Sequence, residues 1–85
     1  MDYIIVAFRS RTQTIEFSKL LASNFIHSEI VNTPKEAGVG CGLSVKINES
    51  VFAVVKRIVH SLPKSSFAGF FLVTSVGGKK RVRSI

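Results

Sequence analysis

Segments with the pattern of strands and segments with the pattern of helices alternate along this chain. Tyr3–Phe8 is a continuous run of β-branched and aromatic residues, which is typical of a strand buried on both faces. Apolar residues then recur at helical spacing through residues 10–24, and Ser10 begins a capping box. A short second strand is predicted over 28–32, and it ends before Pro34, which has no N–H to donate.

The second half of the chain repeats the same order of elements. Leu43–Ile47 alternates apolar and polar residues, which predicts a strand with one buried face. Asn48 is a good helix cap, and apolar residues at helical spacing predict a helix over 48–62. A fourth strand rich in phenylalanine is predicted over Phe67–Ser75, and Gly77-Gly78 marks the expected end of the fold.

The order βαββαβ predicts an α+β, ferredoxin-like sandwich. One antiparallel sheet would carry both helices on one face, and the other face would be free for a partner or a second copy of the chain. The 85 residues can bury a single core, so we expect one domain over residues 1–76. This fold hosts many unrelated functions, so it does not identify one.

The positive charge is concentrated at the C-terminus. The chain has a net charge of +7, and Lys79, Lys80, Arg81 and Arg83 supply four of these charges. Without residues 77–85, 8 basic and 5 acidic residues remain, so the rest of the chain is only mildly basic. We expect residues 77–85 to form a basic, disordered and solvated tail.

The cysteine content and the apolar runs of the chain indicate the cellular compartment in which it works. A single cysteine cannot form an internal disulfide, which argues for a reducing environment. We see no secretion signal and no apolar run long enough to span a bilayer. The sequence therefore predicts a cytoplasmic protein without a membrane segment.

Acid–base, metal and nucleic-acid chemistry find little support in the residues. The five carboxylates are scattered over separate elements. His27 and His60 lie far apart in the sequence, and neither has the spacing to other residues that a catalytic or metal-binding motif requires. One cysteine and two distant histidines do not make a zinc site, so we expect no metal and no cofactor. No Lys/Arg-Gly-Phe motif typical of RNA-binding sheets is present, so nucleic acid is not the favoured partner.

The stretch from Gly38 to Gly42 holds the only thiol of the chain, Cys41, among three glycines. Glycine reaches positive φ without steric cost, and the amides around Gly40 and Gly42 could face an anion. Lys35 and Lys46 are the candidate cations for stabilising a thiolate. Two interpretations stay open from the residues alone, a presented reactive thiol or a small hydrophobe packed in the core.

Three motifs resemble the selenium/sulfur carrier-like family of short one-domain proteins: Tyr3-Ile4-Ile5, Pro34-Lys35-Glu36, and Cys41-Gly42-Leu43-Ser44-Val45. The resemblance runs from about Tyr3 to Val73, and its specific part is the segment from Pro34 to Gly42. It implies that Cys41 is the residue that carries the atom. Members of the family often have Ile-Ser-Ser-type residues before the cysteine, where this chain has Ala37-Gly38-Val39-Gly40. We therefore expect the backbone, without nearby hydroxyls, to hold the sulfur.

These features together predict a carrier that holds sulfur or selenium on Cys41 as a persulfide-type adduct. Such a protein would not be an enzyme in its own right. Its partners would be a protein donor, such as a cysteine desulfurase, and a protein acceptor. Two alternatives stay open, a binding module for RNA or another acidic partner, and a dimerisation domain that uses the free sheet face. In both of them Cys41 would be structural.

Overall fold

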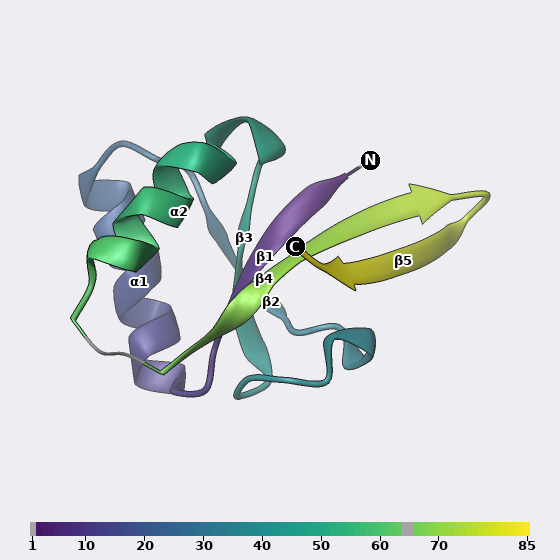
Figure 1. Cartoon of the computed structure of the whole chain (residues 1–85), viewed down its shortest axis with the longest axis horizontal. Coiled ribbons are helices and arrows are strands. Elements are labelled where there is room, and N and C mark those ends of the chain that lie inside the picture. The colour runs from purple at the N-terminus through teal and green to yellow at the C-terminus, as the bar shows by residue number, and fades with distance from the viewer. Residues whose placement is uncertain (1, 64–65) are drawn as a thin grey trace.

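The computed structural model describes residues 2–63 and 66–85. Its elements follow in the order β1 (Tyr3–Phe8), α1 (Arg11–Ser23), β2 (Glu29–Asn32), the 3₁₀ turn η1 (Lys35–Ala37), β3 (Leu43–Ile47), the 3₁₀ turn η2 (Glu49–Val51), α2 (Phe52–Ser61), β4 (Phe67–Val76) and β5 (Lys79–Ser84), as Figure 1 shows. The predicted order of strands and helices is therefore present through β4, and a fifth strand follows it.

A single sheet organises the chain. Its strand order is β2-β3-β1-β4-β5, and each neighbouring pair is antiparallel. The fold is thus α+β, with one antiparallel five-stranded sheet and two helices that lie together on one side of it (Figure 1). The prediction had four strands, whereas the observed sheet has a fifth, β5, which pairs with β4 at the edge.

The central strand β1 explains why its sequence is apolar without interruption. Ile4, Val6 and Phe8 face the helices and belong to a core cluster that includes residues of both α1 and α2. Ile5 and Ala7 point to the opposite face and belong to a second cluster with residues of β4. Successive side chains of a strand alternate between faces, so a strand covered on both sides needs an apolar residue at every position.

The face of the sheet away from the helices is not free, contrary to the prediction. Ala37 and Val39 pack against the second cluster, whose buried members include Ile5 and Val73. These two apolar residues come from the segment between β2 and β3, which crosses that face. Burying apolar side chains on both partners removes them from water, which favours this docking.

The prediction of a disordered tail over residues 77–85 is wrong. Gly77 and Gly78, with φ of 57° and 79°, form a two-residue turn, and β5 pairs with β4 from Lys79 opposite Val76. Tight hairpin turns need positive φ at both central residues, which glycine adopts readily. Val82 pairs with the fully buried Val73 and packs against the second cluster. The Gly-Gly pair therefore joins two strands, and residues 79–84 belong to the sheet.

Candidate functional site

Cys41 lies directly before β3, where the chain passes close to the end of β1. Its backbone N–H donates a hydrogen bond to the carbonyl of Phe8 at 3.1 Å. Gly40 has a φ of 93°, and a Cβ added there would lie only 3.2 Å from the same carbonyl oxygen. On the other side, the carbonyl of Gly42 accepts from the N–H of Thr33 at 2.9 Å. The two glycines predicted to belong to the site therefore hold the cysteine in place between β1 and β2.

Cys41 is half-buried, and its sulfur contacts two oxygens. Sγ lies 3.6 Å from the hydroxyl oxygen of Thr14 and 3.6 Å from the carbonyl oxygen of Leu43. Thr14 is fully buried in α1, and its hydroxyl also donates to the carbonyl of Ser10 at 2.9 Å. A side-chain hydroxyl therefore does lie beside the sulfur, contrary to the expectation drawn from the residues before Cys41. It comes from a helix far away in the sequence.

The first turn of α1 lies next to this sulfur, and Ser10 caps the helix there. The Ser10 hydroxyl accepts from the N–H of Gln13 at 3.1 Å, which is one half of the predicted capping box. The other half is not formed, because the Ser10 N–H donates to the Ser66 hydroxyl and the Gln13 side-chain oxygen accepts from the Ser66 N–H. Helix N-termini carry a partial positive charge that favours nearby anions, thiolates included. The capping residue thus places both Thr14 and Arg11 at the start of a 13-residue helix, close to Cys41.

Opposing effects set the pKa of Cys41, and the net result is a pKa below the ordinary value of 9.0. Burial raises the pKa. It is outweighed by the backbone hydrogen bonds at Leu43 and at Cys41 itself, the side-chain hydrogen bond between Cys41 and Thr14 and the positive charge of Arg11, all of which lower the pKa. The Leu43 carbonyl is not one of these groups, because it can only accept a hydrogen bond from the thiol. Once the sulfur loses its proton, this carbonyl no longer forms a hydrogen bond with it.

The cations predicted to stabilise the thiolate occupy two different places. Lys46 lies on β3 with its Nζ 3.6 Å from a Glu29 carboxylate oxygen and 4.4 Å from the centre of the Tyr3 ring. It is therefore engaged with groups other than the sulfur. Lys35 lies in η1 and lines a shallow hollow of about 270 Å³ together with Gly38, Gly40 and Gly42.

Arg11, which the sequence did not single out, supplies a positive charge that helps to lower the pKa of Cys41. The sequence predicted a helix shortly after β1, but it did not predict that this helix begins close to Cys41. Within residues 2–63 and 66–85, no three or more His, Cys, Asp or Glu side chains are grouped so that they could hold a metal ion. Among the same residues, no helix is long and apolar enough to cross a membrane.

Comparisons with known proteins place this chain in a family. Neither the curated proteins nor the solved structures that were compared contain a match to the chain. One family model matches residues 2–63, which include β1, α1, the cysteine segment and α2, and which leave out the β4–β5 hairpin. The matched part is well over half of the chain and contains Cys41 with every group found around its sulfur, so the chain belongs to the family described as Putative Se/S carrier protein-like.

Proposed function

We propose that this protein is a carrier that accepts sulfur or selenium on Cys41 and passes it to a partner protein. The observation that carries the proposal is the half-buried thiol with a lowered pKa, held between Thr14, Arg11 and the backbone around Leu43. A thiol with a lowered pKa has more of its nucleophilic form near neutral pH. Membership of the Se/S carrier-like family supports the same chemistry.

The loading step is an exchange of one sulfur atom between two thiols. The Cys41 thiolate attacks the terminal sulfur of a donor persulfide, R–S–SH. A bond forms between Sγ and that sulfur, and the bond between the two donor sulfurs breaks. Its electron pair stays on the donor sulfur, which leaves as a thiolate, while Cys41 becomes Cys41–S–SH. The step needs no external oxidant or reductant, and selenium in place of the terminal sulfur follows the same course.

The surrounding residues would serve the two halves of this reaction. Arg11 and the hydrogen bonds at the sulfur stabilise the attacking thiolate, and the same groups can stabilise the anionic persulfide once it has formed. Gly40 and Gly42 hold Cys41 against β1 and β2. Lys35 lines the hollow beside Gly40 and Gly42, where it would meet an incoming anionic donor.

In this proposal the chain acts as a carrier on a ferredoxin-like scaffold and not as an enzyme in its own right. Nothing but Cys41 would bond to the transferred atom. A donor such as a cysteine desulfurase would create the persulfide, and an acceptor protein would consume it. A thiol that has to stay reduced between these events suits a reducing compartment such as the cytoplasm.

The test is loading by a small persulfide. The purified protein is treated with glutathione persulfide and examined as an intact chain by mass spectrometry. We expect a mass gain of one sulfur atom that disappears on treatment with a reductant and on Cys41→Ser. Ser61→Cys, which adds an exposed thiol on α2 to the Cys41→Ser background, serves as the matched control.

The control separates a built site from any accessible thiol. If the thiol at position 61 loads as fast as Cys41, the surroundings of Cys41 contribute nothing and the carrier proposal fails. If Cys41 loads only after the protein is unfolded, the cysteine is a packing residue. Faster loading at Cys41 in the folded protein supports the proposal.

A further inference from the structure

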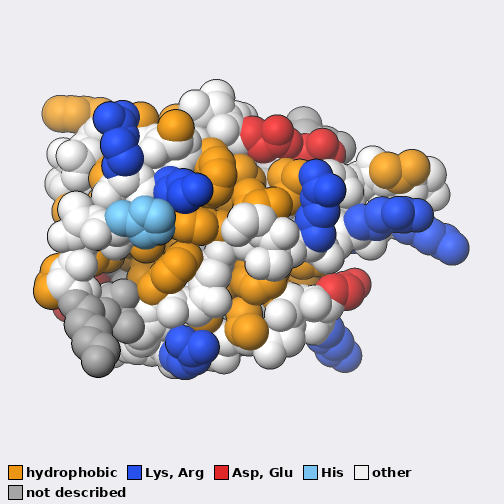
Figure 2. Space-filling view, viewed as in Figure 1, with side chains coloured by type: hydrophobic (Ala, Val, Ile, Leu, Met, Phe, Trp, Pro, Cys, Tyr) orange, Lys and Arg blue, Asp and Glu red, His pale blue; other side chains and the backbone are white. Residues whose placement is uncertain are grey.

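The strand β5 is the most strongly charged element of the molecule. Four of its six residues are the cations Lys79, Lys80, Arg81 and Arg83, and all four are exposed. β5 is an edge strand, and together with the end of β4 it forms a two-stranded ribbon that extends away from the helices (Figure 1). Lys and Arg side chains gather over this ribbon on the face shown in Figure 2.

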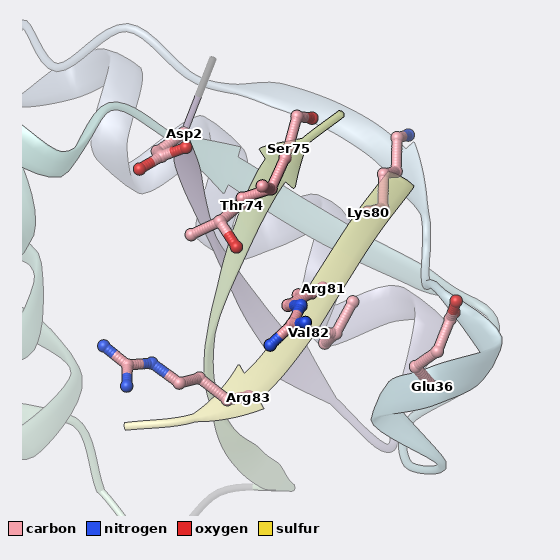
Figure 3. A pocket seen from close by; sticks show the side chains of 9 residues that line it. Asp2, Glu36, Thr74, Ser75, Lys80, Arg81, Val82 and Arg83 are labelled. Atoms are coloured by element: carbon pink, nitrogen blue, oxygen red, sulfur yellow. The ribbon is translucent and has the colours of Figure 1, made fainter. Parts of the chain in front are cut away.

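These cations project from both faces of the ribbon. Alternate residues of a strand share a face, so Lys79, Arg81 and Arg83 lie on one side and Lys80 on the other. In the close-up view of Figure 3, the side chain of Lys80 points in a different direction from those of Arg81 and Arg83. A flat partner would reach the cations of only one face, whereas a groove with charged walls would reach both.

Little negative charge compensates the ribbon. The residues opposite Lys79, Lys80 and Arg81 on β4 are Val76, Ser75 and Thr74. Within the residues that the structure describes, the only ion pair joins Lys46 to Glu29, on the far side of β1. Asp2 and Glu36 do line the same hollow of about 690 Å³ as Lys80, Arg81 and Arg83 (Figure 3). Two carboxylates make that hollow a poor anion site, so the exposed edge and tip of the ribbon are the relevant surface.

We propose that the β4–β5 ribbon binds a nucleic-acid duplex through its phosphates. A two-stranded β-ribbon is one of the few elements that enter the groove of a duplex, where phosphates border it on both sides. From Lys79 to Arg83 the strand spans about 14 Å at about 3.4 Å per residue. That length is comparable with the major groove of B-form DNA, which is about 12 Å wide.

The residue types in the ribbon favour a duplex over a single strand. Single strands are held largely by stacking their bases on aromatic side chains. Residues 74–85 contain no aromatic residue, so the ribbon offers only charge and the hydroxyls of Thr74 and Ser75. Contacts to phosphates carry no sequence information, and we therefore expect binding that is independent of sequence.

The ribbon lies outside the segment that matches the family model, which ends at residue 63. Duplex binding by the ribbon is therefore independent of the proposed carrier function, and either one can be wrong while the other holds. In the same way, loss of the Cys41 thiol should leave duplex binding unchanged.

The experiment measures the binding of a fluorescent DNA duplex to the full chain by anisotropy over a range of salt concentrations. Four phosphate contacts predict a slope of about −3.6 for log K against log salt, or a loss of about 150-fold in affinity between 50 and 200 mM salt. The variant K79Q/R81Q/R83Q keeps only Lys80 on the ribbon, so its slope should fall to about −0.9 and its binding should be weak at every salt concentration. An RNA duplex in parallel shows whether the B-form or the A-form groove is the better fit.

A matched control removes the same charge elsewhere. K19Q/K56Q/R57Q neutralises three exposed cations of α1 and α2 and should keep the slope of the unchanged protein. Equal losses in the two triple variants would mean that only net charge matters, and would overturn the proposal. So would an unstructured single strand or polyglutamate that binds as tightly as the duplex. If the unchanged protein does not bind a duplex at low salt, the proposal is wrong. The cations would then serve to keep the exposed edge strand from pairing with other chains.

Discussion

The hydroxyl of Thr14 lies 3.6 Å from the sulfur of Cys41, although 27 positions separate the two residues in the sequence. This hydroxyl has one proton, which it donates to the Ser10 carbonyl at 2.9 Å. The same carbonyl also accepts the N–H of Thr14 at 3.0 Å, so it keeps a partner if the hydroxyl turns away. Thr14 can therefore accept from the thiol and donate to the thiolate by rotating one bond.

Thr14→Val should make Cys41 a weaker nucleophile at neutral pH. Valine keeps the shape of threonine but removes the hydroxyl that lowers the pKa of the thiol, so the pKa of Cys41 should rise. The rate of alkylation by iodoacetamide, measured against pH, reports this as a shift of the curve to higher pH. Thr14→Ser keeps the hydroxyl and should leave the curve near that of the unchanged protein. Identical curves for all three proteins would exclude a role for Thr14 at the sulfur.

The stability of the protein should depend on pH through Cys41. The pKa of this thiol is lower in the folded chain than its ordinary value of 9.0, so the unfolded state holds the proton more strongly. The thiolate therefore contributes stability that is fully present above 9.0 and is lost as pH falls through the folded pKa. The difference in the free energy of unfolding between the unchanged protein and Cys41→Ser should grow as pH rises towards 9.0. Urea unfolding at several pH values measures it, and a constant difference would contradict the lowered pKa.

Gly40→Ala should both destabilise the protein and slow the reactions of Cys41. The new Cβ would lie 3.2 Å from the Phe8 carbonyl oxygen at a φ of 93°, which side chains rarely adopt. Backbone strain of this kind costs about 1–3 kcal/mol, and the chain would shift away from β1 together with the hydrogen bond of Cys41. Gly38→Ala is the control, because at φ 64° its Cβ meets nothing within 4 Å. It should cost about 1 kcal/mol and leave alkylation of Cys41 unchanged. Equal effects of the two changes would show that the close approach to Phe8 is unimportant.

Phe25→Gly should stabilise the protein by about 1 kcal/mol, because Phe25 follows α1 at a positive φ that costs a side chain about this much. The N–H of Ile26 donates back to the carbonyl of Leu21 at 2.9 Å, and the Phe25 side chain is 98% exposed, so little packing is lost. Thermal unfolding provides the measurement. Phe25→Ala keeps the strained backbone and should change the midpoint of thermal unfolding far less. If Phe25→Ala raises the midpoint as much as Phe25→Gly does, the gain comes from removing the exposed ring and not from relieving the backbone.

Much of the fold follows from local patterns. The unbroken apolar run of β1, the helical spacing in α1 and the capping role of Ser10 each depend on neighbouring residues, and the structure confirms all three. The β5 strand was missed because Lys79–Arg83 reads as a solvated charge run. Its strand form depends on Gly77 and Gly78 turning the chain and on Val82 covering Val73.

Periodicity in the sequence predicts the strands and helices from β1 to β4, and the glycine content places Cys41 in a glycine-rich segment, because both signals act over a few residues. The surroundings of the sulfur, in contrast, depend on how distant segments pack together. The hydrogen bond from the Cys41 N–H to Phe8 and the antiparallel pairing of β1 with β3 bring the segment beside the start of α1. That packing supplies the hydroxyl of Thr14 and the charge of Arg11, and leaves Lys46 with Glu29. Contacts between residues far apart in the sequence arise from register and packing of the whole sheet, and no local pattern records them.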